Sequence, residues 1–206
     1  MSERVLLLHG IWMRGFSLWR LRRWLRERGF EPECLEYASI LGGTERAVRR
    51  IARRVEVLGR EGPVHLVGHS LGGLVALEAI RRAPQLPFGR VVCLGSPLNG
   101  SRVARRLGDW PGTGRLLGRS GAILLSGIEH WDGLREVGVI AGSLPFGLGA
   151  MVGPLARPHD GTVAVAETRL AGISDHRIVP ASHTGLLLSR EAADLTAGFL
   201  HHGRFA

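Results

Sequence analysis

The chain has 206 residues, of which 45% are hydrophobic, a composition typical of one folded domain and not of a disordered segment. Its 27 basic residues are all arginine and outnumber the 18 acidic residues, which gives a formal net charge of +9. No apolar run approaches the roughly 20 residues needed to cross a bilayer, and the first residues lack a secretory signal pattern, so a single cytoplasmic domain over residues 1–206 is expected.

Strand-like and helix-like segments alternate along the chain. Short apolar, β-branched runs predict strands at 5–8, 33–37, 64–67, 90–94, 137–141 and 175–179. Apolar residues at helical spacing predict helices at 18–28, 44–58, 71–83 and 189–201. Such alternation is typical of an α/β fold with a doubly wound, mostly parallel sheet and helices on both faces. Residues 102–136 lie between two predicted strands and are expected to form a small cap, or none.

Residues 68–72 read Gly-His-Ser-Leu-Gly and separate a predicted strand from a predicted helix. A serine on so sharp a turn needs small neighbours, because the backbones of the strand and the helix pass close together. The turn would lift the hydroxyl of Ser70 out of the fold and direct the amide of Leu71 to the place where an oxyanion forms. This context favours a serine nucleophile over a structural turn in which Ser70 only caps the helix.

A serine nucleophile requires a base to accept its proton and a carboxylate to orient that base. Besides the C-terminal pair, four histidines follow Ser70, namely His130, His159, His176 and His183. His183 comes directly after the last predicted strand, where a loop can return to the carboxyl edge of the sheet. His176 lies inside that strand and is expected to be structural, so His183 is the candidate base.

Two aspartates precede His183 and follow the strand predicted at 137–141. Asp160 lies in a loop, whereas Asp175 opens the next predicted strand, a position typical of a surface role. Order along the chain and placement in a loop favour Asp160 as the acid, and Asp175 remains the alternative.

A second oxyanion donor is expected after the first strand, where Gly10 follows His9 and lets the chain turn so that the amide of Ile11 faces Ser70. Apolar residues near this turn and near Asp160 are candidates for an acyl pocket, since apolar walls favour a hydrophobic ester over a sugar or a nucleotide. These candidate substrate-binding residues are Trp12, Met13, Phe16, Phe146 and Met151.

Taken together, these motifs resemble the α/β-hydrolase superfamily, and within it the small, nearly lidless bacterial lipases and esterases. The matching pieces, in family order, are Leu7-Leu8-His9-Gly10, Gly68-His69-Ser70-Leu71-Gly72-Gly73, Gly95-Ser96-Pro97, Asp160-Gly161-Thr162-Val163 and Ser182-His183-Thr184-Gly185-Leu186. The resemblance implies Ser70 as nucleophile, Asp160 as acid and His183 as base. It also implies Ile11 and Leu71 as oxyanion donors. Many such lipases have a glycine two or three residues after the His-Gly pair, where this chain has Trp12 and Met13.

The expected activity is therefore hydrolysis of a small apolar ester or acyl substrate through an acyl-enzyme at Ser70. A thioesterase or an acyltransferase would use the same three residues. An alternative of another class is a non-catalytic protein of the membrane surface, because the arginine-rich segment 19–28 carries Trp19 and Trp24 and is suited to weak peripheral contact with a bilayer.

Other partners are not indicated by the sequence. No nucleic-acid motif accompanies the arginine blocks, which are typical of solvated helix faces, so nucleic acid is not expected. Neither a metal-ligand spacing nor a nucleotide fingerprint occurs, and no metal or cofactor is expected. The oligomeric state stays open.

Overall fold

A computed structural model describes residues 3–110, 117–133, 135–147 and 149–205. Within these ranges six strands form one sheet in the order β2-β1-β3-β4-β5-β6, and all five strand pairs are parallel. The strands are β1 (Arg4–Leu8), β2 (Glu31–Leu35), β3 (Val64–His69), β4 (Val91–Leu94), β5 (Val137–Gly142) and β6 (Asp175–Val179). The predicted fold class is confirmed.

Helices connect the strands and cover the sheet. The α-helices are α1 (Trp19–Glu27), α2 (Gly43–Leu58), α3 (Leu71–Arg82), α4 (Arg102–Asp109), α6 (Gly121–Ser126), α7 (Gly149–Val152) and α8 (Arg190–His202). Short 3-10 helices are η1 (Gly15–Leu18), η2 (Gly59–Glu61), η3 (Gly118–Ser120), η4 (Val165–Thr168) and η5 (Gly185–Leu188). None of the helices in the described ranges combines the length and the apolar character that a membrane crossing requires.

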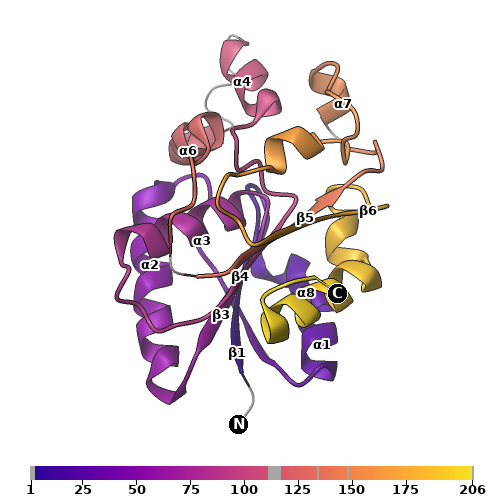
Figure 1. The fold of residues 1–206 in the computed structure, drawn as a ribbon. Helices are drawn as coiled ribbons and strands as arrows, with labels where there is room; N and C mark the ends of the chain where they lie inside the picture. The colour runs from indigo at the N-terminus through magenta and orange to yellow at the C-terminus, as the bar shows by residue number, and fades with distance from the viewer. Residues whose placement is uncertain (1–2, 111–116, 134, 148, 206) are drawn as a thin grey trace.

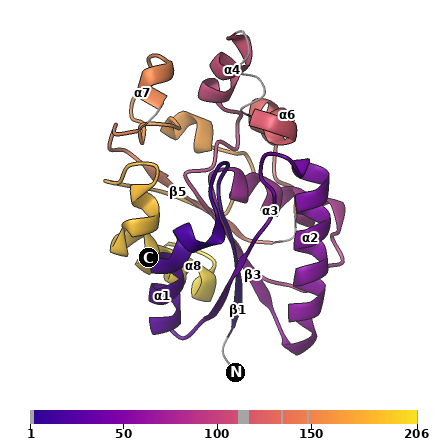
Figure 2. The same ribbon diagram turned by 180° about the vertical axis from the view of Figure 1, so that it is seen from behind.

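The sheet separates two hydrophobic clusters, as the alternation of side chains along β1 shows. Leu6 and Leu8 pack in the cluster that α2 and α3 close, whereas Val5 and Leu7 pack in the cluster that α1 and α8 close. Figures 1 and 2 show these two helix pairs on opposite faces of the sheet. Because both faces of β1 are covered, its side chains are continuously apolar, as is typical of a parallel strand in an α/β fold.

The second strand differs from its predicted position. It covers Glu31–Leu35, in register with β1 from Arg4 to Leu8, and not residues 33–37. Pro32 is tolerated inside it because β2 is an edge strand, so the missing amide costs no bond to a further neighbour. Glu36 and Tyr37, read as strand residues in the sequence, instead follow the strand.

All six strands run toward the same edge of the sheet, since all pairs are parallel. Figure 1 shows α4, α6 and α7 at this carboxyl edge, opposite the N-terminus of the chain. Helices α4 and α6 belong to the segment 102–136, in which residues 111–116 and 134 lie outside the description. A cap function for this segment stays a prediction.

Three glycines let α3 begin directly on the ends of the strands. A Cβ at Gly68 would lie 2.3 Å from the backbone of Gly72 and Gly73, and a Cβ at Gly72 would lie 2.3 Å from the carbonyl oxygen of Leu8. At Gly73 a Cβ would lie 2.2 Å from the hydroxyl of Ser96. Such distances exclude any side chain at the first two positions without movement of the backbone.

The Gly72→Ala variant should therefore be destabilised by about 1–3 kcal/mol, the usual cost of overpacking. The matched control is Gly198→Ala in α8, where no atom lies within 4 Å of the new Cβ and alanine should stabilise the helix by about 0.5–1 kcal/mol. Urea denaturation gives both free energies of unfolding. Equal effects of the two substitutions would contradict the close contact between α3 and β1.

Candidate active site

Ser70 lies at the turn between β3 and α3 in a strained backbone conformation, with φ 54° and ψ −120°. Within the described ranges, Ser70 and Trp12 are the two non-glycine residues with positive φ. The turn is fixed on both sides, because the amide of Ser70 donates to the carbonyl of Leu94 at 2.9 Å and the amide of Gly73 donates to the carbonyl of Ser70 at 3.1 Å. Strain held by surrounding structure is typical of functional sites.

Asp160 and His183 form a buried pair. The Nδ1 atom of His183 lies 2.7 Å from Oδ2 of Asp160, whose side chain is almost fully buried. The other carboxylate oxygen accepts hydrogen bonds from the amides of Thr162 at 2.9 Å and Val163 at 2.7 Å. Because a carboxylate only accepts, Nδ1 of His183 carries the proton, and Nε2 is left with a lone pair.

A glycine provides the space for this pair. Gly95, at the end of β4, has φ 56°, and a Cβ there would lie 3.2 Å from both Oδ2 of Asp160 and Nδ1 of His183. The amide of His183 also donates to the carbonyl of Asp160 at 2.8 Å, so backbone and side chain hold the two residues together.

His69 connects the His183 loop to the turn that carries Ser70. Its buried ring lies 4.7 Å from the ring of His183, and its Nε2 lies 2.9 Å from the carbonyl oxygen of His183, to which it must donate. Burial, together with the nearby His183, lowers the pKa of His69 to about 3. His69 is thus neutral at pH 7. No hydrogen bond in the described part of the chain joins the hydroxyl of Ser70 to His183.

The loop after β1 turns beside Ser70. A Cβ at Gly10 would lie 3.2 Å from both Cβ of Ser70 and Nδ1 of His69, and the amide of Met13 closes the turn on the carbonyl of Gly10 at 3.3 Å. Trp12 takes φ 60° in this turn. Among the described residues, none accepts a hydrogen bond from the amide of Ile11. A role of this amide as an oxyanion donor stays a prediction.

Two residues after β2 hold this loop, a role that no local sequence pattern predicts. The hydroxyl of Tyr37 donates to the carbonyl of His9, and its ring stacks on the ring of His9 with centroids 4.3 Å apart. Glu36 accepts a hydrogen bond from the amide of Gly15 at 2.6 Å. The loop is therefore tied to the sheet on both sides of Ile11.

The predicted pocket residues do not all come together. Trp12 and Met13 line a hollow of about 490 Å³ together with Ile40 and Leu41. Phe16 and Phe146 are 76% and 73% exposed, respectively, and the side chain of Met151 lies outside the description. Substrate binding by these residues stays a prediction.

The remaining sequence candidates lie elsewhere or serve the loops. Asp175 lies at the amino end of β6, three strands away from β3, and accepts hydrogen bonds from the amides of His176 and Phe205. The ring of His176 contacts the hydroxyl of Thr168 at 2.8 Å, and Nδ1 of His159 accepts from the amide of Gly161 at 3.1 Å. In the described ranges no three or more His, Cys, Asp or Glu residues gather as metal ligands.

Comparison with known proteins bears on the fold and the family. A model described as the alpha/beta hydrolase family matches residues 5–201. No curated protein sequence matches the chain.

Several solved structures share the fold at low sequence identity. The mature form of the Bacillus licheniformis lipase BlEst2 is 17% identical, with a TM-score of 0.76 over 98% of this chain and 92% of that one. Its propeptide form is 16% identical, with a TM-score of 0.81 over 95% of this chain, which spans only 50% of that longer chain. The thioesterase domain SrfTE, which cyclises the lipopeptide surfactin, is 15% identical, with a TM-score of 0.60 over 98% and 90% of the two chains.

The buried His69 predicts a pH dependence of stability. A base whose pKa falls on folding, here from 6.5 to about 3, binds protons more readily in the unfolded chain. Its contribution to stability is therefore complete above pH 6.5 and is lost as the pH falls toward 3. In the His69→Gln variant, the side-chain amide can donate the same bond without titrating. As the pH is lowered, the free energy of unfolding of the variant should therefore fall less steeply than that of the unaltered protein, by up to about 1.4 kcal/mol per pH unit.

Urea denaturation of both proteins between pH 7 and pH 4 measures this difference in slope. His9, His65 and His176, whose pKa values are also lowered by burial, are present in both proteins, so the difference in slope reports on the replacement of His69. Identical slopes would show that His69 is not buried as a neutral ring.

Proposed function

Because the chain belongs to the alpha/beta hydrolase family, we propose that it is a serine hydrolase that cleaves carboxylic esters through an acyl-enzyme at Ser70. The observation that carries the proposal is the buried Asp160–His183 pair, with Nδ1 and Oδ2 2.7 Å apart, beside a strained serine at a strand-to-helix turn. A hydroxyl, an imidazole and a carboxylate from three distant stretches of chain thus lie at one edge of the sheet.

In the proposed reaction, Nε2 of His183 takes the proton of Ser70 as the serine oxygen attacks the acyl carbon. The hydrogen bond between these two groups is made in the substrate complex, since such bonds commonly tighten only there. Asp160 keeps Nδ1 of His183 protonated and stabilises the imidazolium. His183 then returns the proton to the leaving group, and a water activated in the same way releases the acid.

In this proposal the amides of Leu71 and Ile11 donate hydrogen bonds to the substrate oxygen and stabilise the negative charge that develops on it. Leu71 opens α3, so its amide has no partner within the helix and lies at the positive end of the helix dipole. The bonds from Glu36 and Tyr37 support the loop that carries Ile11, so that little reorganisation accompanies the reaction.

The neutral state of His69 supports the same proposal. His183 becomes a cation during each half of the reaction, and a second cation with its ring 4.7 Å away would oppose this step. Because burial lowers the pKa of His69 to about 3, its ring holds the His183 loop without adding charge.

Loss of the nucleophile should abolish turnover. For Ser70→Ala we expect hydrolysis of p-nitrophenyl butyrate to fall by about 10⁶-fold, because the remaining groups cannot form the acyl-enzyme. Labelling with a fluorophosphonate, followed by peptide mapping, should modify Ser70 in the unaltered protein only. Ser126→Ala, which changes an exposed serine of α6, is the control. Turnover retained in Ser70→Ala would refute the assignment.

The two candidate acids can be separated by matched variants. Asp160→Asn leaves His183 without a carboxylate that fixes its tautomer, so kcat should fall by about 10⁴-fold. Asp175→Asn removes the same charge from the far end of β6 and should leave kcat within about twofold, although weaker bonds to His176 and Phe205 can lower the unfolding temperature. Steady-state kinetics decides, and the reverse ranking would contradict the role of Asp160.

A further inference from the structure

Three hollows abut along the surface from the candidate active site across α2. The first, of about 490 Å³, begins at Trp12 and Met13. It shares Tyr37 and Arg50 with a second hollow of about 390 Å³, which in turn shares Arg46 and Arg49 with a third of about 580 Å³. These three neighbouring hollows, which share lining residues, are here together called the arginine trough.

The trough is strongly basic. Eight arginines line it, against the three acids Glu36, Glu45 and Glu78. The arginines come from the loop after β1, from α2, from the end of α3 and from η3, namely Arg14, Arg46, Arg49, Arg50, Arg53, Arg81, Arg82 and Arg119. Residues distant in the sequence thus contribute charge of one sign to one surface.

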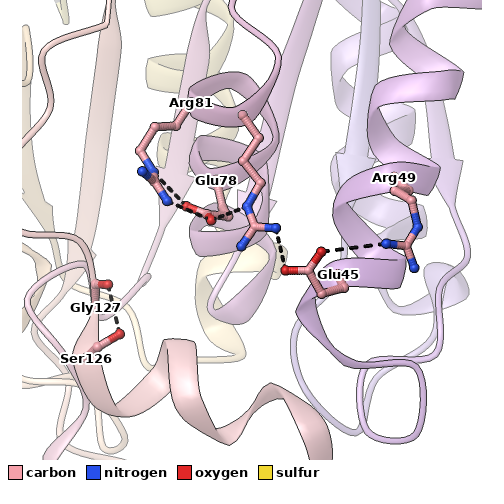
Figure 3. A network of polar contacts seen from close by, with 7 residues as sticks. Glu45, Arg49, Glu78, Arg81, Ser126 and Gly127 are labelled. Atoms are coloured by element: carbon pink, nitrogen blue, oxygen red, sulfur yellow. Dashed lines mark hydrogen bonds and ion pairs between the residues drawn. The ribbon is translucent and has the colours of Figure 1, made fainter.

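The acids of the trough are already engaged. Figure 3 shows Glu78 between Arg81 and an arginine that also reaches Glu45, and Glu45 paired with Arg49. Burial opposes the ionisation of Glu78, but the hydrogen bonds from Arg81 and Arg82 outweigh it and hold its pKa below the usual value. Glu36 accepts the amide of Gly15 at 2.6 Å. The carboxylates therefore neutralise only part of the charge.

Five arginines of the trough remain without a carboxylate. Arg14, Arg46, Arg50, Arg53 and Arg119 are all exposed, and none of them forms an ion pair within the described ranges. Guanidinium groups bind phosphate through two parallel hydrogen bonds, so several of them along one depression suit a ligand that carries more than one phosphate.

We propose that the arginine trough binds the phosphate groups of the leaving group of an acyl substrate, which makes phosphorylated acyl esters or thioesters the substrate class. The proposal rests on the proposed function. The trough begins at Trp12 and Met13, which follow the proposed oxyanion donor Ile11 in the sequence. In this proposal the leaving group lies along these two residues, in place of the acyl chain that the sequence suggested there.

A thioester substrate would react in two steps, acylation of Ser70 and hydrolysis of the acyl-enzyme. The oxygen of Ser70 forms a bond to the acyl carbon, the carbon–sulfur bond breaks, and His183 gives the serine proton to the departing thiolate. Water then cleaves the serine ester to release the acid, with no redox change and no further reactant.

The test compares hexanoyl-coenzyme A, whose leaving group carries phosphates, with hexanoyl-N-acetylcysteamine, which presents the same thioester without them. The unaltered protein should show a kcat/KM at least about tenfold higher for the phosphorylated substrate at low salt, and the preference should shrink at high salt. In Arg46→Gln/Arg50→Gln the preference should disappear through a higher KM, while turnover of the neutral thioester is unchanged.

The control is Arg26→Gln/Arg60→Gln, which removes the same charge from exposed, unpaired arginines outside the trough.

Monomeric dihexanoyl-phosphatidylglycerol is the third substrate. If its turnover, and not that of the coenzyme A ester, depends on Arg46 and Arg50, the phosphate belongs to a lipid headgroup. No preference for either phosphorylated substrate, or an equal loss in the control, overturns the proposal.

A binding measurement separates this proposal from the proposed function. Calorimetric titration of Ser70→Ala with coenzyme A needs no turnover. Binding that is weakened about tenfold or more by Arg46→Gln/Arg50→Gln, and not by the control pair, supports the trough even if no ester is cleaved. Absence of binding in the presence of esterase activity rejects the trough and leaves the hydrolase assignment intact.

Discussion

The contact on which the site depends is the approach of α3 to the ends of β1 and β3. Gly68 and Gly72 have no room for a side chain, because a Cβ added at either position would lie 2.3 Å from backbone atoms. The helix can therefore start one residue after the strand, and Ser70 is forced into a conformation that few side chains adopt. The same contact brings the start of α3 next to the loop after β1. The positions of the proposed nucleophile and of both proposed oxyanion amides are thus consequences of one packing constraint.

The Asp160–His183 pair is placed in a different way. Four hydrogen bonds hold it as a local unit: the bond between the side chains, the bond between the backbones and the two amides that Asp160 accepts. None of them reaches Ser70. The link to the turn that carries Ser70 is the bond from the ring of His69 to the carbonyl of His183 at 2.9 Å. The residue next to the proposed nucleophile therefore joins the two parts of the candidate site.

Much of this arrangement could be read from the sequence, since it depends on local patterns. The six strands follow from short apolar runs, the fold class from the alternation of strand-like and helix-like segments, and the turn at Ser70 from its glycines. The predicted position of the second strand lies two residues too late, because Glu36 and Tyr37 look like strand residues and the register with β1 depends on tertiary contacts. For the same reason no pattern revealed that Tyr37 binds the carbonyl of His9. Contacts between segments far apart in sequence leave no local periodicity.

The basic residues also show that contacts between distant segments cannot be read from sequence patterns. In the sequence, every arginine block is equivalent to a solvated helix face. In the structure, Arg81 and Arg82 are held by Glu78, whereas Arg46 and Arg50 of α2 have no acidic partner among the described residues. Unneutralised charge in a depression attracts anions more strongly than the same charge on a convex surface, because the low-dielectric walls focus the field. The depression reaches Trp12 and Met13, which follow the proposed oxyanion donor Ile11, and this position underlies the proposal that it binds the leaving group. The net charge of the chain does not say where unneutralised positive charge lies. The ion pairs of the individual arginines show that it is concentrated on this surface.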